Sequence, residues 1–340
     1  MLRRLRGHSG FLLVVLLIAA AALGAKAAEP PSTTTPPSAQ ICFIPQWTPQ
    51  AQFAGYYVAF EKGFYAARGL NVKILEGGPT RPSAQWLQKG EARFATMFLS
   101  TAVVERAKGI RLVDIGQMVA RSSQVLIVKK SRGIKTVPAM NGKKVGLWGG
   151  ELSIMPMALF QKYGVHVIAV PQTWSVNLFL RGGVDVASAM MYNEYHTILQ
   201  AGVDPDQLRV FHLSGLGFNV PEDGIYCMES TLEKDPETCR LFVQASVEGW
   251  RYAFAHPGEA LGIVMKYVNR ARIATNRQHQ QWMLEHMREV IDLPPPGACP
   301  AAIKKSDYMA IGHELMTNGI IHQIPDFSSL FKNCVAVHEK

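Results

Sequence analysis

The feature that most constrains the fold is an alternation of strands and helices that runs through the first two thirds of the chain and restarts once. Apolar stretches such as ICFIPQ and ARFATMFL alternate with helical stretches such as STAVVERAKG. This order predicts an α/β fold with a parallel-rich sheet covered by helices on both faces. The alternation begins again at KKVGLWGG, near Lys143, whereas the last hundred residues are almost all predicted helix.

A weak internal repeat favours two lobes. GEARFATMFLSTAVVERAKGIRL and GGVDVASAMMYNEYHTILQAGVDP share a strand that follows a glycine and ends at a polar helix start. Two segments, SSQVLIVKK and EDGIYCMES, cross between the units, and two crossings make a hinge that suits closure on a small molecule. We expect a two-lobed α/β fold with the ligand cleft between the lobes; one continuous doubly wound sheet is the alternative. The first lobe comprises residues 40–127 and 224–335 with the C-terminal helices, and the second lobe comprises residues 128–223.

Residues 1–28 have the order of a secretory signal. Three arginines come first, FLLVVLLIAAAAL is an apolar run short for a membrane span, and AKA precedes a small residue at Ala28. Residues 29–39 are rich in Pro, Ser and Thr, which is typical of a flexible segment. We expect export to the periplasm with cleavage near Ala27 or Ala28; a retained membrane anchor is the alternative.

The charge distribution argues against nucleic acid as a partner. The formal net charge is +9, and the signal segment contributes four of the basic residues and no acidic one. The other Lys and Arg residues are scattered, with no basic block that interleaves aromatic residues. We expect a monomer that binds a small molecule.

The cysteines and histidines do not indicate a metal centre. The five cysteines form no CxxC pair and no Cys/His cluster, and the histidines outside the signal are dispersed. An exported protein meets an oxidising compartment, and Cys299 with Cys334 is the best candidate for a disulfide; buried unpaired cysteine is the alternative. We expect no metal and no cofactor.

The stretch WTPQAQFAGYYVAFEKGFYAARGL concentrates aromatic residues at the exit of the first strand. In an α/β protein, ligands are held where strands give way to helices. A planar heteroaromatic ligand would stack on Trp47 or on a tyrosine, which combines apolar burial with ring packing. We expect Gln50, Phe53 and Tyr56 beside it. Helix packing is the alternative for the tyrosines.

Two further junctions carry polar side chains. Ser100 and Thr101 offer hydroxyl groups at a helix start, although a serine there is also a common helix N-cap. Tyr192, Asn193 and Glu194 follow another apolar strand. The carboxylate of Glu194 can accept hydrogen bonds from the amino group and ring nitrogen of an aminopyrimidine; in the alternative it complements the helix dipole.

Other positions complete the expected site. Trp148, Gly149 and Gly150 form a rim of the second lobe with free backbone amides. Asp223, in the return crossing, either contacts the ligand or holds the hinge. These residues and the aromatic stretch should meet at one cleft.

Several of these segments together resemble a known family. WTPQAQFAGYYVAFEKGFYAARGLNVKI, the GLWGG turn, AMMYNEY and EDGIYC resemble periplasmic solute-binding proteins of the thiamine-pyrimidine-precursor type. That family includes the pyrimidine synthase of yeast thiamine biosynthesis and is similar to the sulfonate, nitrate and riboflavin binders. The resemblance covers about residues 40 to 330. It implies two α/β lobes closed on a ligand, which is delivered to an ABC permease at the inner membrane.

Within this resemblance we expect a binding protein, with the thiamine pyrimidine synthase, an enzyme, as the alternative of a different class. The synthases carry a lysine for pyridoxal phosphate and a sacrificial histidine four residues apart; Thr96 and Ser100 occupy the matching positions here. Without that lysine there is no obvious Schiff-base partner. Bacterial pyrimidine binders often carry Asn-Thr-Asn-His where this chain has Gln-Ala-Gln-Phe at residues 50–53. We expect an aminopyrimidine ligand, with riboflavin, another heterocycle or a small sulfonate as alternatives.

Overall fold

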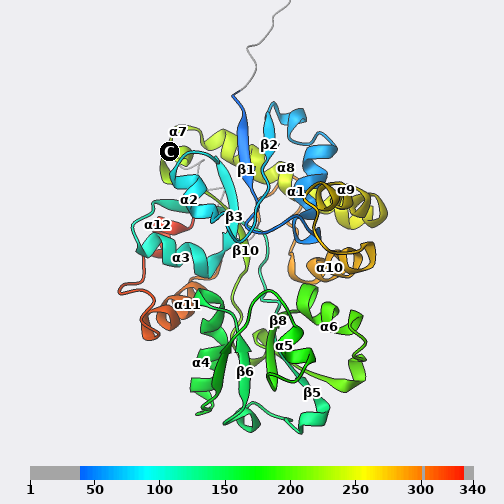
Figure 1. The fold of residues 1–340 in the computed structure, drawn as a ribbon. Helices are drawn as coiled ribbons and strands as arrows, with labels where there is room; N and C mark the ends of the chain where they lie inside the picture. Colours follow the sequence, from blue (N-terminus) through cyan, green and yellow to red (C-terminus); the bar gives the residue numbers. More distant parts are fainter. Residues whose placement is uncertain (1–38, 301–302, 333–340) are drawn as a thin grey trace, which may run out of the picture. The chain divides into compact units, whose positions relative to one another are not determined.

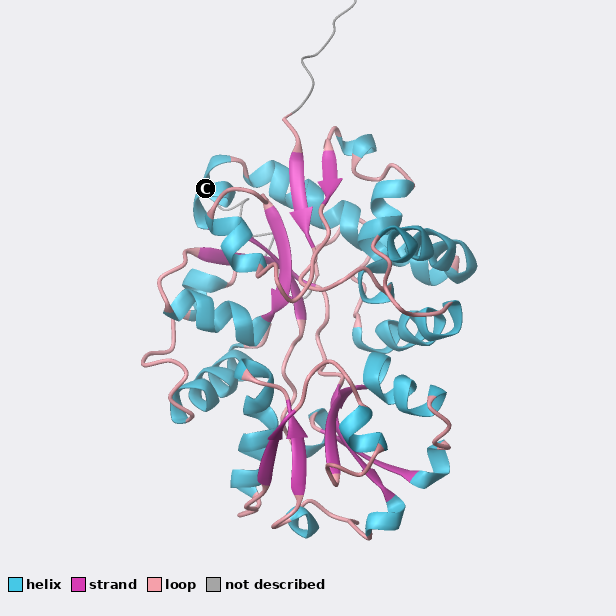
Figure 2. Cartoon of the chain, in the orientation of Figure 1, coloured by secondary structure: helices cyan, strands magenta, loops and turns pink. Residues whose placement is uncertain are grey.

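Two separate sheets, each accompanied by helices, make up the part of the chain that the structure describes (Figure 1, Figure 2). The structure is a computed structural model, and it describes residues 39–300 and 303–332. The expected signal segment lies outside these residues. The two sheets confirm the predicted α/β class, and we call the halves built on them the first and the second lobe.

The first lobe is built on a five-stranded sheet in the order β2-β1-β3-β10-β4. Strands β1 to β3 run parallel, whereas β10 is antiparallel to both of its neighbours. The strands are β1 (Ile41–Ile44), β2 (Val72–Ile74), β3 (Phe94–Phe98), β4 (Leu112–Gln117) and β10 (Asp223–Met228). The central strands are buried along most of their length, as the near-continuous apolar runs predict.

The second lobe repeats this arrangement in the order β7-β6-β8-β5-β9. Strand β6 is parallel to both neighbours, and β5 is antiparallel to both of its own. The strands are β5 (Gln124–Lys129), β6 (Lys144–Leu147), β7 (Ile168–Pro171), β8 (Val186–Met190) and β9 (Leu208–His212). The antiparallel inner strand is β10 in the first lobe and β5 in the second. In both lobes the chain enters this strand directly after crossing from the other lobe.

The helices fall into three groups. Those packed with the first sheet or its helices are α1 (Ala54–Glu61), α2 (Ser83–Gln88), α3 (Leu99–Ala107), α7 (Glu229–Lys234), α8 (Pro236–Ala255), α9 (Pro257–Arg270), α10 (Arg277–Val290) and α12 (Phe327–Leu330). Those of the second lobe are α4 (Ile154–Lys162), α5 (Asn177–Leu180) and α6 (His196–Gln200). Helix α11 (Lys305–Thr317) packs against both α3 and α4.

A close crossing of α1 and α8 organises the core of the first lobe. A Cβ added at Gly249 would lie 2.0 Å from the carbonyl oxygen of Gly55, so neither α8 nor α1 could approach as closely with a larger residue there. Around this crossing, the ring of Phe242 stacks on Phe94 with ring centroids 4.2 Å apart. At this crossing the ring of Tyr56 of α1 lies beside that of Trp250 of α8, with centroids 6.0 Å apart.

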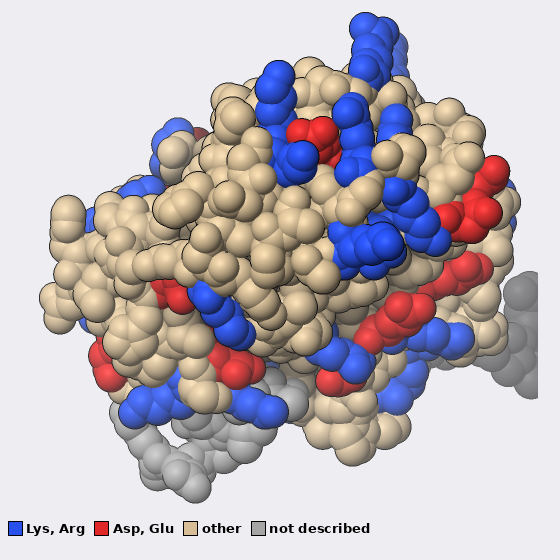
Figure 3. Space-filling model, turned by 90° about the horizontal axis from the view of Figure 1, so that it is seen from below, with Lys and Arg blue, Asp and Glu red and all other residues tan. Residues whose placement is uncertain are grey.

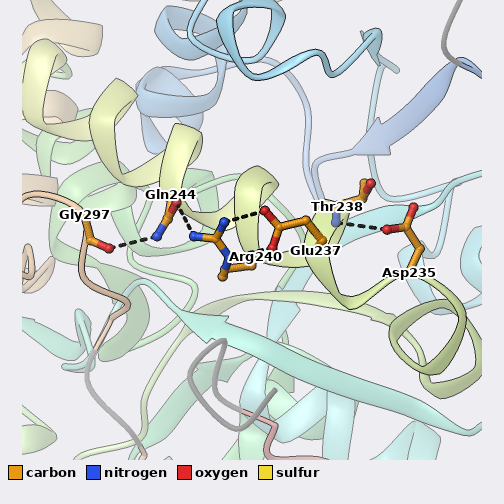
Figure 4. Close-up of polar contacts among 6 residues, drawn as sticks. All are labelled: Asp235, Glu237, Thr238, Arg240, Gln244 and Gly297. Atoms are coloured by element: carbon orange, nitrogen blue, oxygen red, sulfur yellow. Dashed lines mark hydrogen bonds and ion pairs between the residues drawn. The ribbon is translucent and has the colours of Figure 1, made fainter. Parts of the chain in front are cut away.

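The long helix α8 is fixed at its start and along its outer face (Figure 4). The side chain of Asp235 accepts a hydrogen bond from the backbone N–H of Thr238 at 3.1 Å, which caps the helix. Arg240 contacts both Glu237 and Gln244, and Gln244 Nε2 donates to the carbonyl of Gly297 at 2.8 Å. This chain of contacts ties the segment after α10 to α8.

The two segments that cross between the lobes, residues 120–123 and 219–222, are hydrogen-bonded to each other. Glu222 accepts hydrogen bonds from Ser122 Oγ at 3.3 Å and from the backbone N–H of Ser123 at 2.5 Å. Asn219 accepts from the backbone N–H of Ser122 and donates to the carbonyl of Ala120. The crossings thus form a paired hinge rather than two independent linkers.

The cysteines take two forms. Cys299 is disulfide-bonded, and its expected partner Cys334 lies outside the described residues. Cys42, Cys227 and Cys239 are free thiols. No helix within residues 39–300 or 303–332 is long and apolar enough to span a membrane.

Candidate functional site

A cavity of about 330 Å³ lies between the two lobes. From the first lobe it is lined by the loops after β1 and β2, by the start of α2 and by the β3–α3 junction. From the second lobe it is lined by the segments that follow β6, β7 and β8. The junctions at which strands give way to helices therefore converge on one site, as expected for this type of fold.

Three tryptophans and a tyrosine dominate the walls. Trp47 of the first lobe and Trp174 of the second meet edge to face, with ring centroids 4.5 Å apart and planes at 65°. Trp174 is 60% exposed, so this contact lies at the cavity mouth, whereas Trp148 and Tyr192 are buried. The side chains suit the faces of a flat, largely apolar ring system.

The Trp47 loop is held by a close backbone contact. A Cβ added at Gly77 would lie 1.9 Å from the carbonyl oxygen of Pro45 and 2.6 Å from that of Trp47. Glycine at this position therefore allows the loop after β2 to pass directly against the loop after β1. The backbone N–H of Gln46 donates to Thr96 Oγ1 at 2.9 Å, which fixes the same loop to β3.

Asp223 supports this wall from behind. It lies buried at the start of β10 and accepts hydrogen bonds from Gln46 Nε2 at 2.6 Å and Gln52 Nε2 at 2.8 Å. Gln50 Nε2 donates in turn to Gln52 Oε1 at 2.5 Å. Burial raises the pKa of Asp223 to about 7, against the lowering effect of the two glutamine donors. Asp223 itself does not line the cavity, and it orients three glutamines that do.

The opposite wall is formed by an unusual turn of helix. Residues Met191–Tyr195 form a π-helix at the exit of β8, and such turns are frequent at functional sites. Within it, Glu194 accepts hydrogen bonds from the backbone N–H of Met190 and from Asn193 Nδ2, both at 2.9 Å. Burial raises the pKa of the Glu194 carboxyl to about 7. Near neutral pH this group therefore exists in both an accepting and a donating form.

The cavity carries acidic but no basic side chains. Of the residues that the structure describes, Glu105 and Glu194 line it and no lysine or arginine does so. Lys and Arg side chains lie on the outer surface, for example on the face seen from below in Figure 3. Within the described residues, no group of three or more His, Cys, Asp and Glu side chains could hold a metal ion.

Eight of the residues expected from the sequence line this cavity. They are Trp47, Gln50, Thr101, Trp148, Gly149, Tyr192, Asn193 and Glu194. Their roles in binding stay a proposal, but their convergence from both lobes is a property of the fold.

Four other residues expected at the site, Phe53, Tyr56, Ser100 and Gly150, do not line this cavity. Phe53 and Tyr56 are buried in the core; the Tyr56 ring packs on Phe43 at 4.9 Å. Ser100 lines a separate cavity of about 30 Å³ beside Glu222. It lies inside the first turn of α3 rather than at its N-cap. Gly150 is exposed and takes a left-handed φ of 65° without lining the main cavity.

Sequence reasoning missed several lining residues. Trp174 lies in the segment just after β7, which ends at Pro171, so the junction rule that selected Trp47 also applies to it. Ser83 is the first residue of α2. Its buried Oγ and the buried Nε1 of Trp148 have no hydrogen-bond partner among the described residues. Because unpaired buried polar atoms are costly, these two atoms are candidate contacts for a ligand.

A family model described as NMT1/THI5 like matches residues 50–260. The match covers more than half of the chain. The chain belongs to the NMT1/THI5-like family. The resemblance inferred from the sequence is thereby confirmed at the level of the family.

Two relatives of this NMT1/THI5-like chain are binding proteins by name. The riboflavin-binding protein RibY of Chloroflexus aurantiacus is 27% identical over 73% of this chain and 72% of its own length. The formylaminopyrimidine-binding protein of Halalkalibacterium halodurans is 22% identical over 73% of this chain and 76% of its own.

The family also contains enzymes. The 4-amino-5-hydroxymethyl-2-methylpyrimidine phosphate synthase THI11 of Saccharomyces cerevisiae is 23% identical over 65% of this chain and 69% of its own.

The fold is shared with solved binding proteins. The periplasmic aliphatic sulphonate binding protein SsuA from Escherichia coli superposes with a TM-score of 0.67 at 15% identity, over 85% of this chain and 91% of that one. At this identity the likeness shows the fold alone, and it confirms the expected two-lobed arrangement.

Proposed function

We propose that this protein is the substrate-binding component of an ABC importer and that it binds a planar nitrogen heterocycle between its lobes. The observation that carries the proposal is the aromatic, cation-free cavity of about 330 Å³, walled by Trp47 and Trp174 from opposite lobes and by the buried Trp148. Its volume lies in the range of pockets for drug-sized ligands. Location in the periplasm and delivery to a membrane permease belong to this proposal.

The size of the cavity favours a fused-ring ligand such as riboflavin. A single pyrimidine ring would leave much of the cavity unfilled, and poorly filled apolar space forfeits dispersion contacts. The extra rings of a flavin can lie against several tryptophans at once. The similarity to a riboflavin-binding relative supports the same choice.

An aminopyrimidine is the second candidate, and Glu194 is the observation that favours it. Its buried carboxyl group is oriented by Asn193 and by the Met190 amide, and it can receive an amino group and a ring nitrogen in a charge-assisted contact. The similarity to a formylaminopyrimidine-binding relative supports this candidate.

The synthase reaction of the enzyme relatives lacks support at the residues that it needs. No lysine lines the cavity, Thr96 is buried in β3 as the acceptor for the Gln46 amide, and Ser100 faces a different cavity. Pyridoxal phosphate would find no amine there for a Schiff base. Mixing the purified protein with pyridoxal phosphate should give no internal-aldimine absorbance; an adduct together with pyrimidine formation would restore the enzyme.

Isothermal titration calorimetry tests the proposal. The purified protein is titrated with riboflavin, an aminopyrimidine and an alkanesulfonate. We expect binding of riboflavin or the aminopyrimidine and none of the sulfonate, because no cation lines the cavity. Trp47→Ala should weaken whichever heterocycle binds, whereas Trp86→Ala, at a partly buried tryptophan of α2 outside the cavity lining, should not. Tight sulfonate binding alone would contradict the proposal.

A further inference from the structure

Helix α10 joins the two walls of the cavity without lining it. On the first-lobe side, Gln280 Oε1 accepts a hydrogen bond from the backbone N–H of Ala51 at 2.6 Å. On the second-lobe side, Trp282 Nε1 donates to the carbonyl oxygen of Met191 at 2.9 Å. The helix lies beside α6 and the π-helix (Figure 1). Helix α10 therefore connects the segment that contains Ala51 in the first lobe to the π-helix Met191–Tyr195 in the second lobe.

A chain of side-chain hydrogen bonds runs from α10 to Glu194. His279 Nε2 and Asn193 Oδ1 are 3.0 Å apart, and Asn193 Nδ2 donates to Glu194 Oε1 at 2.9 Å. Because the amide nitrogen of Asn193 faces the carboxyl group, its oxygen faces His279. The hydrogen of a neutral His279 is consequently on Nε2, as the donor in this contact.

The other ring nitrogen of His279 meets His196 of α6. The two Nδ1 atoms are 2.9 Å apart, and the ring planes lie within 18° of each other with centroids 5.1 Å apart. With its hydrogen on Nε2, His279 accepts at Nδ1, so His196 Nδ1 donates. One face of the His196 ring stacks on Trp282 with centroids 4.7 Å apart. The contact between the histidines requires that His279 Nδ1 carries no proton.

The charged and titratable groups around this pair are few. His286 of α10 stacks on Trp282 at 4.0 Å and acts on His196 through its charge, and Tyr195 packs on the same indole. Residues 51–53 carry no titratable side chain, α6 contributes only His196, and Glu194 reaches the pair through Asn193. The charged groups of α9 have other contacts: Glu259 with Lys62, Lys266 with Glu61, and Arg270 over Tyr267.

We propose that His279 is a positioning residue that fixes the Asn193–Glu194 turn when the lobes close, and that its protonation releases the turn. We call the contact of His279 with Asn193 the latch. This proposal rests on the proposed function only for the identity of the ligand. Burial, followed by the charge of His196, lowers the pKa of His279 to about 4. In an open form the imidazole would titrate near its ordinary pKa of about 6.5. The closed form thus binds fewer protons, so closure is favoured above about pH 6.5 and is lost as the pH falls toward about 4.

Small-angle X-ray scattering without ligand tests the latch directly. The radius of gyration is measured at about pH 7.5 and about pH 5, on either side of the ordinary histidine pKa. The variants are His279→Gln, whose amide can still donate to Asn193 but does not titrate, and His279→Ala, which cannot donate. His256→Gln, at an exposed histidine between α8 and α9, is the matched control.

Wild type and His256→Gln should be compact at the higher pH and expanded at the lower one. His279→Gln should be compact at both, and His279→Ala expanded at both. Should His279→Ala stay as compact as wild type while wild type shows no change with pH, the latch is refuted.

Ligand affinity provides the second readout. With riboflavin as the probe near neutral pH, His279→Ala should bind about tenfold more weakly, the size of one lost hydrogen bond. His279→Gln should bind within about threefold of wild type and lose the weakening in acid. If wild type binds neither riboflavin nor an aminopyrimidine while the scattering result holds, the proposed function fails and the latch stands. If ligand affinity is strong and equal in wild type and both variants at both pH values, and the radius of gyration does not change either, the proposed function stands and the latch is refuted.

Discussion

Trp148 offers a ligand both a ring face and a free donor. Its indole is 5% exposed, and its Nε1 has no hydrogen-bond partner in the structure. The free protein tolerates this unpaired donor, which is a cost that a ligand acceptor would remove. The residue therefore combines stacking with a polar contact, and the two contributions can be separated by substitution.

Trp148→Phe should lower ligand affinity by about 0.5–1.5 kcal/mol without lowering the free energy of unfolding by a similar amount, because the ring is largely kept and only an unpaired N–H is removed. Calorimetry measures the first quantity and chemical denaturation the second. Trp250→Phe is the matched control, since Trp250 is also a buried tryptophan but lies in the core against α1. Its substitution should leave affinity unchanged. Equal binding losses in both variants would mean that the Trp148 donor does not face the ligand.

Glu194 should discriminate between the two candidate ligands. Glu194→Gln keeps an oxygen acceptor for the Met190 amide but removes the charge, so an aminopyrimidine should bind more weakly by about 1.5–3 kcal/mol. Riboflavin should lose much less. Glu105→Gln is the control, because Glu105 also lines the cavity but pairs with Lys108. A large loss of riboflavin and none of the aminopyrimidine in Glu194→Gln would reverse our assignment of this carboxyl.

At the scale of elements, the sequence predicts which strands and helices exist better than it predicts which side of each helix faces the core. Alternating apolar and helical stretches were enough for the α/β class and for the restart of the pattern. They did not reveal that the turn of 3₁₀ helix at Ala51–Phe53 precedes α1. Phe53 and Tyr56 face the core because α8, far away in sequence, packs on α1 at Gly55. Such tertiary contacts leave no local periodic signal.

The candidate site was predictable where it depends on strand ends, and less so elsewhere. Trp47, Trp148 and Glu194 follow strands directly, so the junction rule found them. The same rule, applied to Trp174, would have found that residue too. His279 gives no such signal, since it lies in a C-terminal helix and meets Asn193 across 86 positions of sequence.

The paired hinge should respond to pH through Glu222. Burial, and then the charge of Asp223, raise the pKa of Glu222 to about 8. A carboxyl with a raised folded-state pKa contributes stability that is full below its ordinary pKa and is lost as the pH rises through the folded value. The hinge is therefore expected to weaken between about pH 4.5 and about pH 8, in the direction opposite to the histidine latch.

Glu222→Gln should remove this dependence. The amide oxygen still accepts from Ser122 and Ser123, but the side chain no longer ionises. At about pH 9 the variant should be more stable than wild type by at least about 1 kcal/mol, and near pH 5 the two should be similar. Denaturation curves at both pH values measure the difference. A variant that is less stable than wild type at high pH would show that the ionised carboxylate holds the hinge.

For the whole molecule, export is the first expectation to check. The signal segment lies outside the described residues, so cleavage near Ala27 or Ala28 stays a prediction from the sequence. Mass spectrometry of the protein from a periplasmic extract should find an N-terminus at or just after these residues. An intact N-terminus on cytoplasmic protein would contradict both the location and the importer role.

The central claim is that a flat heterocycle is held between the two lobes by tryptophans from each. A crystal structure of the protein grown with riboflavin, and a second grown with an aminopyrimidine, tests it most directly. We predict that the bound ring lies in the cavity against Trp47 and Trp148, with Glu194 at its polar edge and with the His279–Asn193 contact formed. A ring bound outside this cavity, or a cavity without ligand at saturating concentrations of both compounds, would contradict the account.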